Sequence, residues 1–158
     1  MARLPKSGCY SKDPGFQHFI SVTLDVFAFL QDYRFFLDRY DDAKNECSVR
    51  FKNTTTGVEV RYEVPNPPTV SLARLSKNGQ FTRDQYGLKF LICERCPQFE
   101  PDCNSSRSSP EAGFEDLLQS YAAILKGYAN DVLDGDFSVF RHLDRHVRTE
   151  MRRLRKET

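Results

Sequence analysis

The segment VEVRYEV, at residues 58–64, constrains the fold more than any other part of the chain, because apolar and polar side chains alternate along it. Successive side chains of a β-strand point to opposite faces of the sheet. One face of this strand is therefore apolar, with Val58, Val60 and Tyr62. The other face is charged and carries Glu59, Arg61 and Glu63. This pattern is typical of an antiparallel sheet that buries one face and exposes the other to water.

Neighbouring segments extend this pattern into a sheet. CSVRFKN, at residues 47–53, alternates too, and NTTTG connects it to residues 58–64 as a glycine-containing hairpin turn. PNPP then interrupts the chain, and TVSLARL at residues 69–75 resumes as a further strand. RFFLDRYD, at residues 34–41, is a candidate first strand. We therefore expect an antiparallel meander of three or four strands.

Helical periodicity occurs on both sides of these strands. Asp13-Pro14-Gly15 is suited to begin a helix, because Asp accepts hydrogen bonds from free N–H groups and Pro fits the first turn. Apolar residues then recur at helical spacing as far as Leu30. Residues 114–128 and 140–154 repeat the pattern, and Asp136 is placed to cap the last helix. Strands grouped between helices predict an α+β fold, with one N-terminal and two C-terminal helices packed on the sheet.

The chain is expected to form one domain. Residues 1–12 are a polar tail, residues 13–158 form a single α+β domain, and residues 94–112 are a loop or insertion within it. Residues 76–112 are less regular, and YGLKFLI is compatible with either a short strand or a helical turn. A chain of 158 residues is long enough to bury a substantial core.

Composition points to a cytoplasmic protein. The net charge of +1 implies no global attraction to nucleic acid or membrane. No apolar run approaches the roughly 18 residues that span a bilayer, and the first residues lack the apolar stretch of a secretory signal. With five cysteines and no signal, free thiols in a reducing compartment are the simplest interpretation.

The stretch CERCPQFEPDC, at residues 93–103, resembles a metal site. Cys93 and Cys96 have zinc-ligand spacing, Cys103 is a possible third ligand, and two histidines of HLDRH lie four residues apart. However, about 45 residues separate the two halves, against about a dozen in the common finger. We expect Cys93 to be buried beside Ile92, with Cys96 and Cys103 in an exposed loop, and we expect no metal and no catalytic disulfide.

Enzyme signatures are missing from the sequence. Leu143 follows His142 where a zinc hydrolase of the H-E-x-x-H type has its general base, and His142 falls opposite the apolar stripe of its helix. We expect His142 to be solvated, and we expect neither His142 nor His146 to have a catalytic role. There is no glycine-rich phosphate loop and no G-x-S-x-G motif. Neither a catalytic residue nor a cofactor is predicted.

One charged surface stands out. The last helix carries a row of arginines at spacings of three and four residues, beside its apolar stripe: Arg141, Arg145, Arg148, Arg152 and Arg155. A solvated face near a helix C-terminus is the simpler interpretation, since the macrodipole favours cations there. The functional interpretation is a binding face for an acidic protein surface or a phosphate backbone, because the planar guanidinium pairs with both.

Two stretches, GVEVRYE and LQSYAAILKGYANDVLDGDFSVF, resemble a family of short, uncharacterised bacterial proteins. The family's turn corresponds here to Leu133, Gly135, Asp136 and Phe140, and the resemblance covers about residues 16–158. The cysteine-rich insertion departs from the family pattern. Some small proteins of this kind are immunity proteins encoded beside toxins, so the resemblance implies a non-enzymatic protein that binds and neutralises a cognate toxin. The arginine row adds the expectation that this toxin has an acidic surface. The alternatives are a nucleic-acid-binding or regulatory protein that uses the arginine row, and a zinc-dependent module.

Overall fold

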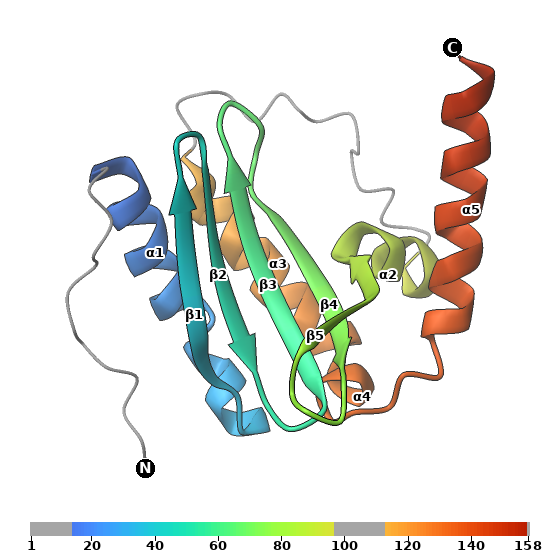
Figure 1. Ribbon diagram of the computed structural model, residues 1–158, viewed down its shortest axis with the longest axis horizontal. Helices are drawn as coiled ribbons and strands as arrows, with labels where there is room; N and C mark the ends of the chain where they lie inside the picture. The colour runs from blue at the N-terminus through green and yellow to red at the C-terminus, as the bar shows by residue number, and fades with distance from the viewer. Residues whose placement is uncertain (1–13, 97–112, 158) are drawn as a thin grey trace.

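A five-stranded antiparallel sheet forms the centre of the protein. The computed structural model describes residues 14–96 and 113–157. The strands follow one another in space in the order of the sequence, as an open meander (Figure 1). They are β1 (Phe36–Ala43), β2 (Glu46–Lys52), β3 (Thr56–Glu63), β4 (Thr69–Leu75) and β5 (Phe81–Gly87). In this register Val49 lies opposite Val60, and Val60 opposite Val70, so the apolar side chains of three strands share one face.

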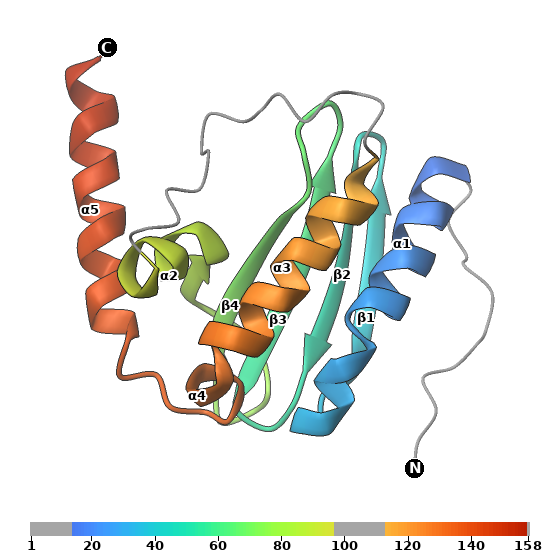
Figure 2. The same ribbon diagram turned by 180° about the vertical axis from the view of Figure 1, so that it is seen from behind.

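Two helices cover this apolar face, as Figure 2 shows from behind. α1 (Pro14–Val26) continues into a 3-10 helix, η1 (Ala28–Tyr33), and lies beside α3 (Phe114–Tyr128). α1 buries Phe16, Phe19 and Ile20, whereas α3 buries Leu118 and Leu125. The short α4 (Asn130–Leu133) follows α3 at the lower end of the sheet.

An aromatic contact joins β3, α1 and α3. The ring of Tyr62 on β3 lies 5.2 Å from that of Phe19 on α1 and 5.5 Å from that of Phe114 on α3, and Phe19 and Phe114 are themselves 5.5 Å apart. Tilted and edge-on rings at these distances add to the energy of apolar burial. Tyr62 is thus partly buried and packs against the core on the apolar face, where the alternation of residues 58–64 places it.

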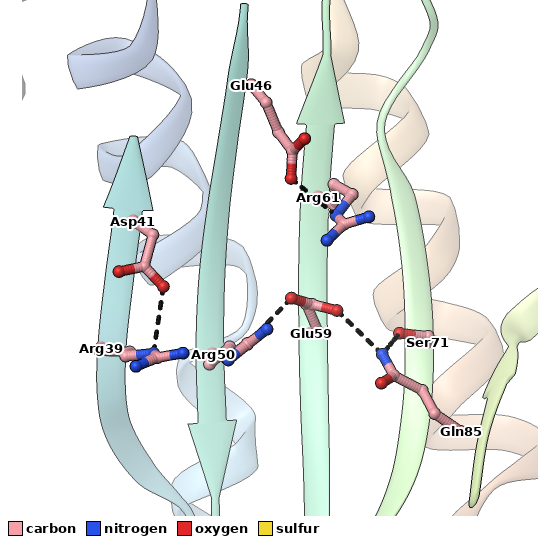
Figure 3. Close-up of polar contacts among 8 residues, drawn as sticks. All are labelled: Arg39, Asp41, Glu46, Arg50, Glu59, Arg61, Ser71 and Gln85. Carbon is pink, nitrogen blue, oxygen red and sulfur yellow. Dashed lines mark hydrogen bonds and ion pairs between the residues drawn. The ribbon is translucent and has the colours of Figure 1, made fainter. Parts of the chain in front are cut away.

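The opposite face of the sheet is charged and internally paired (Figure 3). Glu59 is only 5% exposed, and its carboxylate accepts hydrogen bonds from Arg50 Nε and Gln85 Nε2, each at 2.9 Å. Arg61 pairs with Glu46 at 3.1 Å on the same face. The alternation therefore gave the correct face for Glu59 but the wrong burial, because neighbouring strands supply partners that remove its carboxylate from water.

The sheet has one strand more than we predicted. β1 to β4 confirm the predicted meander, but β5 was not recognised as a strand. The ambiguous YGLKFLI contains both the end of β5 and the start of a helix, α2 (Leu88–Arg95). The helix predicted to run to Leu30 ends at Val26, after which the apolar stripe continues in η1. Asp13, its proposed cap, lies outside the described residues, as does the polar tail at residues 1–12.

The last helix lies at the edge of the molecule. α5 (Phe140–Lys156) packs beside α2 and the β5 side of the sheet, away from α1 and α3 (Figures 1 and 2). It does not lie over the face that α3 covers, so the prediction of two C-terminal helices on the sheet holds for α3 only. Asp136 does not cap α5 directly, since its carboxylate accepts from the N–H of Ser138 in the turn before the helix.

Phe27 provides a test of this core. It is 1% exposed and its ring stacks on Phe51 of β2 at 6.1 Å. Phe27→Ala is expected to lower the free energy of unfolding by about 3–5 kcal/mol, because it leaves a cavity in a packed interior. Urea denaturation measures the change, and Phe36→Ala is the control. Phe36 is 51% exposed, so its loss should be about 1 kcal/mol or less. Equal losses in the two variants would contradict this placement of the core.

Candidate partner-binding surface on α5

The first turns of α5 hold it to the protein. Phe140 and Leu143 are buried, and the ring of Phe140 meets that of Tyr86 on β5 edge-on at 4.8 Å. Burial raises the pKa of Tyr86 above its ordinary value, and the nearby carboxylates of Asp84 and Asp144 raise it further. α5 is thus anchored to the sheet edge by its N-terminal part.

Polar contacts with α2 form a second attachment, which we call the α2–α5 clasp: Glu94 with His142 and His146, and Lys89 with Glu150. One carboxylate of α2 contacts both histidines, since Glu94 lies 3.1 Å from His142 Nδ1 and 2.7 Å from His146 Nε2. Nearer the N-terminus of α2, Lys89 Nζ donates to the Glu150 carboxylate at 2.8 Å. His142 is about half exposed, as predicted, but both histidines connect two helices, which the sequence did not indicate.

Beyond the clasp, α5 extends into solvent. The last residue of the clasp is Glu150, and residues 151–157 are all exposed. Both figures show this C-terminal part running past α2 and clear of the sheet. Two large apolar side chains of the helix, Met151 and Leu154, are 50% and 49% exposed. The apolar stripe of α5 is therefore core at its beginning and surface at its end.

The structure places all five predicted arginines on the exposed surface of α5: Arg141, Arg145, Arg148, Arg152 and Arg155. Arg148 pairs with Asp144 one turn away at 2.7 Å, with 72% of its side chain exposed. A pair this exposed contributes little to stability. The arginine row is thus a true surface feature, and its cations stay accessible to a partner.

The arginine row and the apolar stripe share one shallow hollow. Five residues line this space of about 250 Å³: Val147, Arg148, Met151, Arg152 and Arg155. Its surface is almost wholly apolar, which indicates that the aliphatic stems of the arginines border it while their charged ends reach water. The arrangement can bury a small apolar group and pair with acidic groups around it.

Arg95 fixes the end of α2 that carries Glu94. Its guanidinium donates to both carboxylate oxygens of Asp131 in α4, at 2.6 and 2.5 Å, and to the carbonyl of Tyr128. This contact lowers the pKa of the Asp131 carboxyl below its ordinary value and raises that of Arg95. α2, and with it the clasp, is thereby held to the α3–α4 junction.

Both expectations for the cysteines of α2 are reversed. Cys93 is exposed and Cys96 is buried, because α2 is a helix that turns Leu91 and Ile92 inward. Tyr128 hydrogen-bonds to the Cys96 thiol, which raises the pKa of Tyr128 above its ordinary value. Cys47, Cys93 and Cys96 form no disulfide with one another, and Cys103 lies outside the described residues.

A metal ion has no evident place among the described residues. They contain no group of three or more His, Cys, Asp or Glu side chains arranged to hold one. Zinc ligands lie about 2.0–2.2 Å from the ion, whereas Glu94 and the two histidines bond to one another directly. Because Cys103 is not described, the absence of metal stays a prediction. No helix within residues 14–96 and 113–157 has the length and apolar character needed to cross a bilayer.

Sequence reasoning located the arginine row but missed the residues that support it. Lys89, Glu94 and Arg95 gave no signal, because their partners lie tens of residues away on other helices. Met151 and Leu154 belong to the apolar stripe of their helix, which favoured burial, so the sequence did not indicate their exposure.

Comparisons with protein-family models, curated proteins and solved structures found no match to the chain. The resemblance to short bacterial proteins therefore rests on the sequence motifs alone.

The Arg95–Asp131 pair predicts a pH-dependent contribution to stability. Asp131→Asn is expected to destabilise the protein by about 1 kcal/mol at pH 7, since the pair is partly exposed. The pKa of Asp131 lies below the unfolded value of 3.8. The stabilisation is therefore complete above that value and is lost as the pH falls through the folded pKa. Urea denaturation at several pH values measures it, with Asp42→Asn as an exposed control. A difference that stays constant at all pH values would contradict this account.

The contacts of Glu94 with both histidines are expected to limit the motion of α5 relative to α2. Glu94→Gln removes the charge that both histidines contact, so α5 should separate from α2 more often. Amide hydrogen exchange in residues 144–150 is expected to accelerate about threefold to tenfold. Mass spectrometry measures the exchange, and Glu63→Gln, at an exposed position of β3, is the matched control. If α5 exchanges equally in both variants, the clasp does not hold the helix.

Proposed function

We propose that this protein is a non-enzymatic inhibitor of the immunity type, which binds and neutralises a cognate toxin through the arginine row of α5. The observation that carries the binding role is the exposed end of α5, where Arg148, Arg152 and Arg155 border exposed apolar side chains. The choice of a toxin as partner is supported by the sequence resemblance. A reducing compartment such as the cytoplasm is part of this proposal, and it is supported by the lack of a disulfide among Cys47, Cys93 and Cys96.

Local charge supports an acidic partner. Residues 137–158 contain seven Lys or Arg and three Asp or Glu, a net charge of +4, so the rest of the chain carries −3 to give the total of +1. On the sheet, by contrast, cations are paired with neighbouring anions, as Arg50 is with Glu59 and Arg61 with Glu46. Attraction of an acidic surface should therefore act mainly at α5.

A nucleic-acid-binding or regulatory role is the alternative, and the same arginine row supports it, because guanidinium groups pair with phosphates. The exposed Met151 and Leu154 favour a protein, since a phosphate backbone offers no apolar surface to cover them. No membrane role is proposed.

The two roles differ in their response to charge reversal. The test partner is the protein encoded by the gene adjacent to the one for this chain, titrated by calorimetry. Wild type is expected to form a 1:1 complex. Arg145→Glu with Arg148→Glu should weaken it by about 2–5 kcal/mol, as loss of charge pairs at an interface does, with the melting temperature nearly unchanged. Lys44→Glu with Lys77→Glu, in exposed turns of the sheet, changes net charge equally and should bind like wild type.

Two outcomes would contradict the proposal. If the Arg145 and Arg148 reversal binds the partner like wild type, the arginine row is only a solvated face. If the chain instead binds duplex DNA, with affinity falling against salt at a log–log slope of about −4 to −5, five phosphate contacts and the nucleic-acid role are indicated.

A further inference from the structure

The exposed apolar stripe of α5 needs an apolar partner surface as well as opposite charge. This inference rests on the proposed function and deepens it. We infer that the end of α5 docks as a helix into an apolar groove of a protein partner, with acidic side chains along the rim of that groove. The anchors are Val147, Met151 and Leu154. The rim contacts are Arg148, Arg152 and Arg155.

The geometry of the helix supports this mode. Each of these arginines directly follows an apolar anchor, and successive residues of an α-helix are about 100° apart around its axis. The arginines therefore form a second stripe that borders the first along its whole length. Peptide helices that dock in grooves use anchors at intervals of three, four and seven residues, and residues 147, 151 and 154 have these intervals.

The anchors are available for docking. Met151 and Leu154 remain about half exposed, and both lie beyond Glu150, the residue of α5 that Lys89 contacts. Together with Val147, Met151 lines the hollow that the arginine stems border. Covering this surface removes apolar area from water and so contributes a favourable free energy of binding. Charge pairing alone does not supply this contribution.

Charge decides between possible occupants. A second copy of the chain would bring its own arginine row against the first, and like charges oppose such pairing. A lipid surface is bound by helices with a broad apolar face rich in Trp, Phe or Leu, whereas the exposed end of α5 offers a narrow stripe with Met151 and Leu154. An acid-rimmed groove satisfies both stripes at once.

A designed probe tests this inference without the natural partner. The probe is an antiparallel helical hairpin whose groove is lined by leucine and rimmed by glutamate, and its matched form has a glutamine rim. At about 50 mM salt, where screening is weak, wild type is expected to bind the glutamate hairpin at least about tenfold more tightly than the glutamine hairpin. Met151→Ser with Leu154→Ser should weaken binding about tenfold or more at both low and high salt, because the apolar term is not screened.

Val64→Ser is the matched control, since Val64 is 46% exposed but lies at the end of β3, far from α5 in the fold. It should bind both hairpins like wild type, and all variants should keep the melting temperature. Equal binding of the two hairpins, or unchanged binding by the double serine variant, would overturn the inference. Tighter binding to duplex DNA, or to phosphatidylglycerol vesicles, than to the glutamate hairpin would also overturn it and assign α5 to that ligand.

The two proposals can fail separately. If reversal of Arg145 and Arg148 abolishes the complex with the adjacent gene's product while Met151→Ser with Leu154→Ser leaves it intact, the proposed function stands and the groove is wrong. If the hairpin results hold but that product does not bind, the inhibitor role fails and the groove-binding surface stands.

Discussion

Burial of one face of the sheet determines the rest of the architecture. The valines of β2, β3 and β4 require an apolar cover, and α1 and α3 supply it with the aromatic contact of Phe19, Tyr62 and Phe114. Two helices side by side fill the space over this sheet, as Figure 2 shows. α5 does not lie over this face but at the β5 edge, where Phe140 contacts Tyr86 and the clasp joins the helix to α2.

The elements that could be predicted from the sequence are those with a clear repeat of apolar residues along their length. Four strands and the helix at residues 114–128 were recognisable because alternation or helical spacing extends over their length. β5 was not, because FTRDQYG has no alternating apolar face and its pairing with β4 shifts register between Ala73 and Leu75. α2 was ambiguous because its apolar residues are consecutive, and this error also reversed the burial of Cys93 and Cys96.

The candidate surface was predictable in part, for a similar reason. Exposure of Arg145 or Arg152 follows from position on one helix, and that is a local property. The contact of Glu94 with His146 joins residues 52 apart, so it depends on how α2 and α5 meet in space. An apolar stripe predicts that one face of a helix is buried, but it does not indicate which element covers that face. The stripe of α5 therefore predicted burial at Met151 and Leu154, where the structure shows exposure.

The exposed end of α5 is helical as far as Lys156, and this bears on how it can bind. A short isolated helix is marginal in water because its first turn is costly to form, but here the buried Phe140 and Leu143 and the clasp to α2 nucleate the helix. Beyond the clasp, Arg153 and Glu157 pair one turn apart, and a helix pair of this kind adds about 0.2–0.5 kcal/mol. The exposed turns are thus preordered, and a partner that covers them does not first have to fold them. Preorganisation of this kind reduces the entropy lost on binding. A narrow apolar stripe with an arginine border on such a helix would therefore bind a protein partner more tightly than an unfolded tail of equal charge.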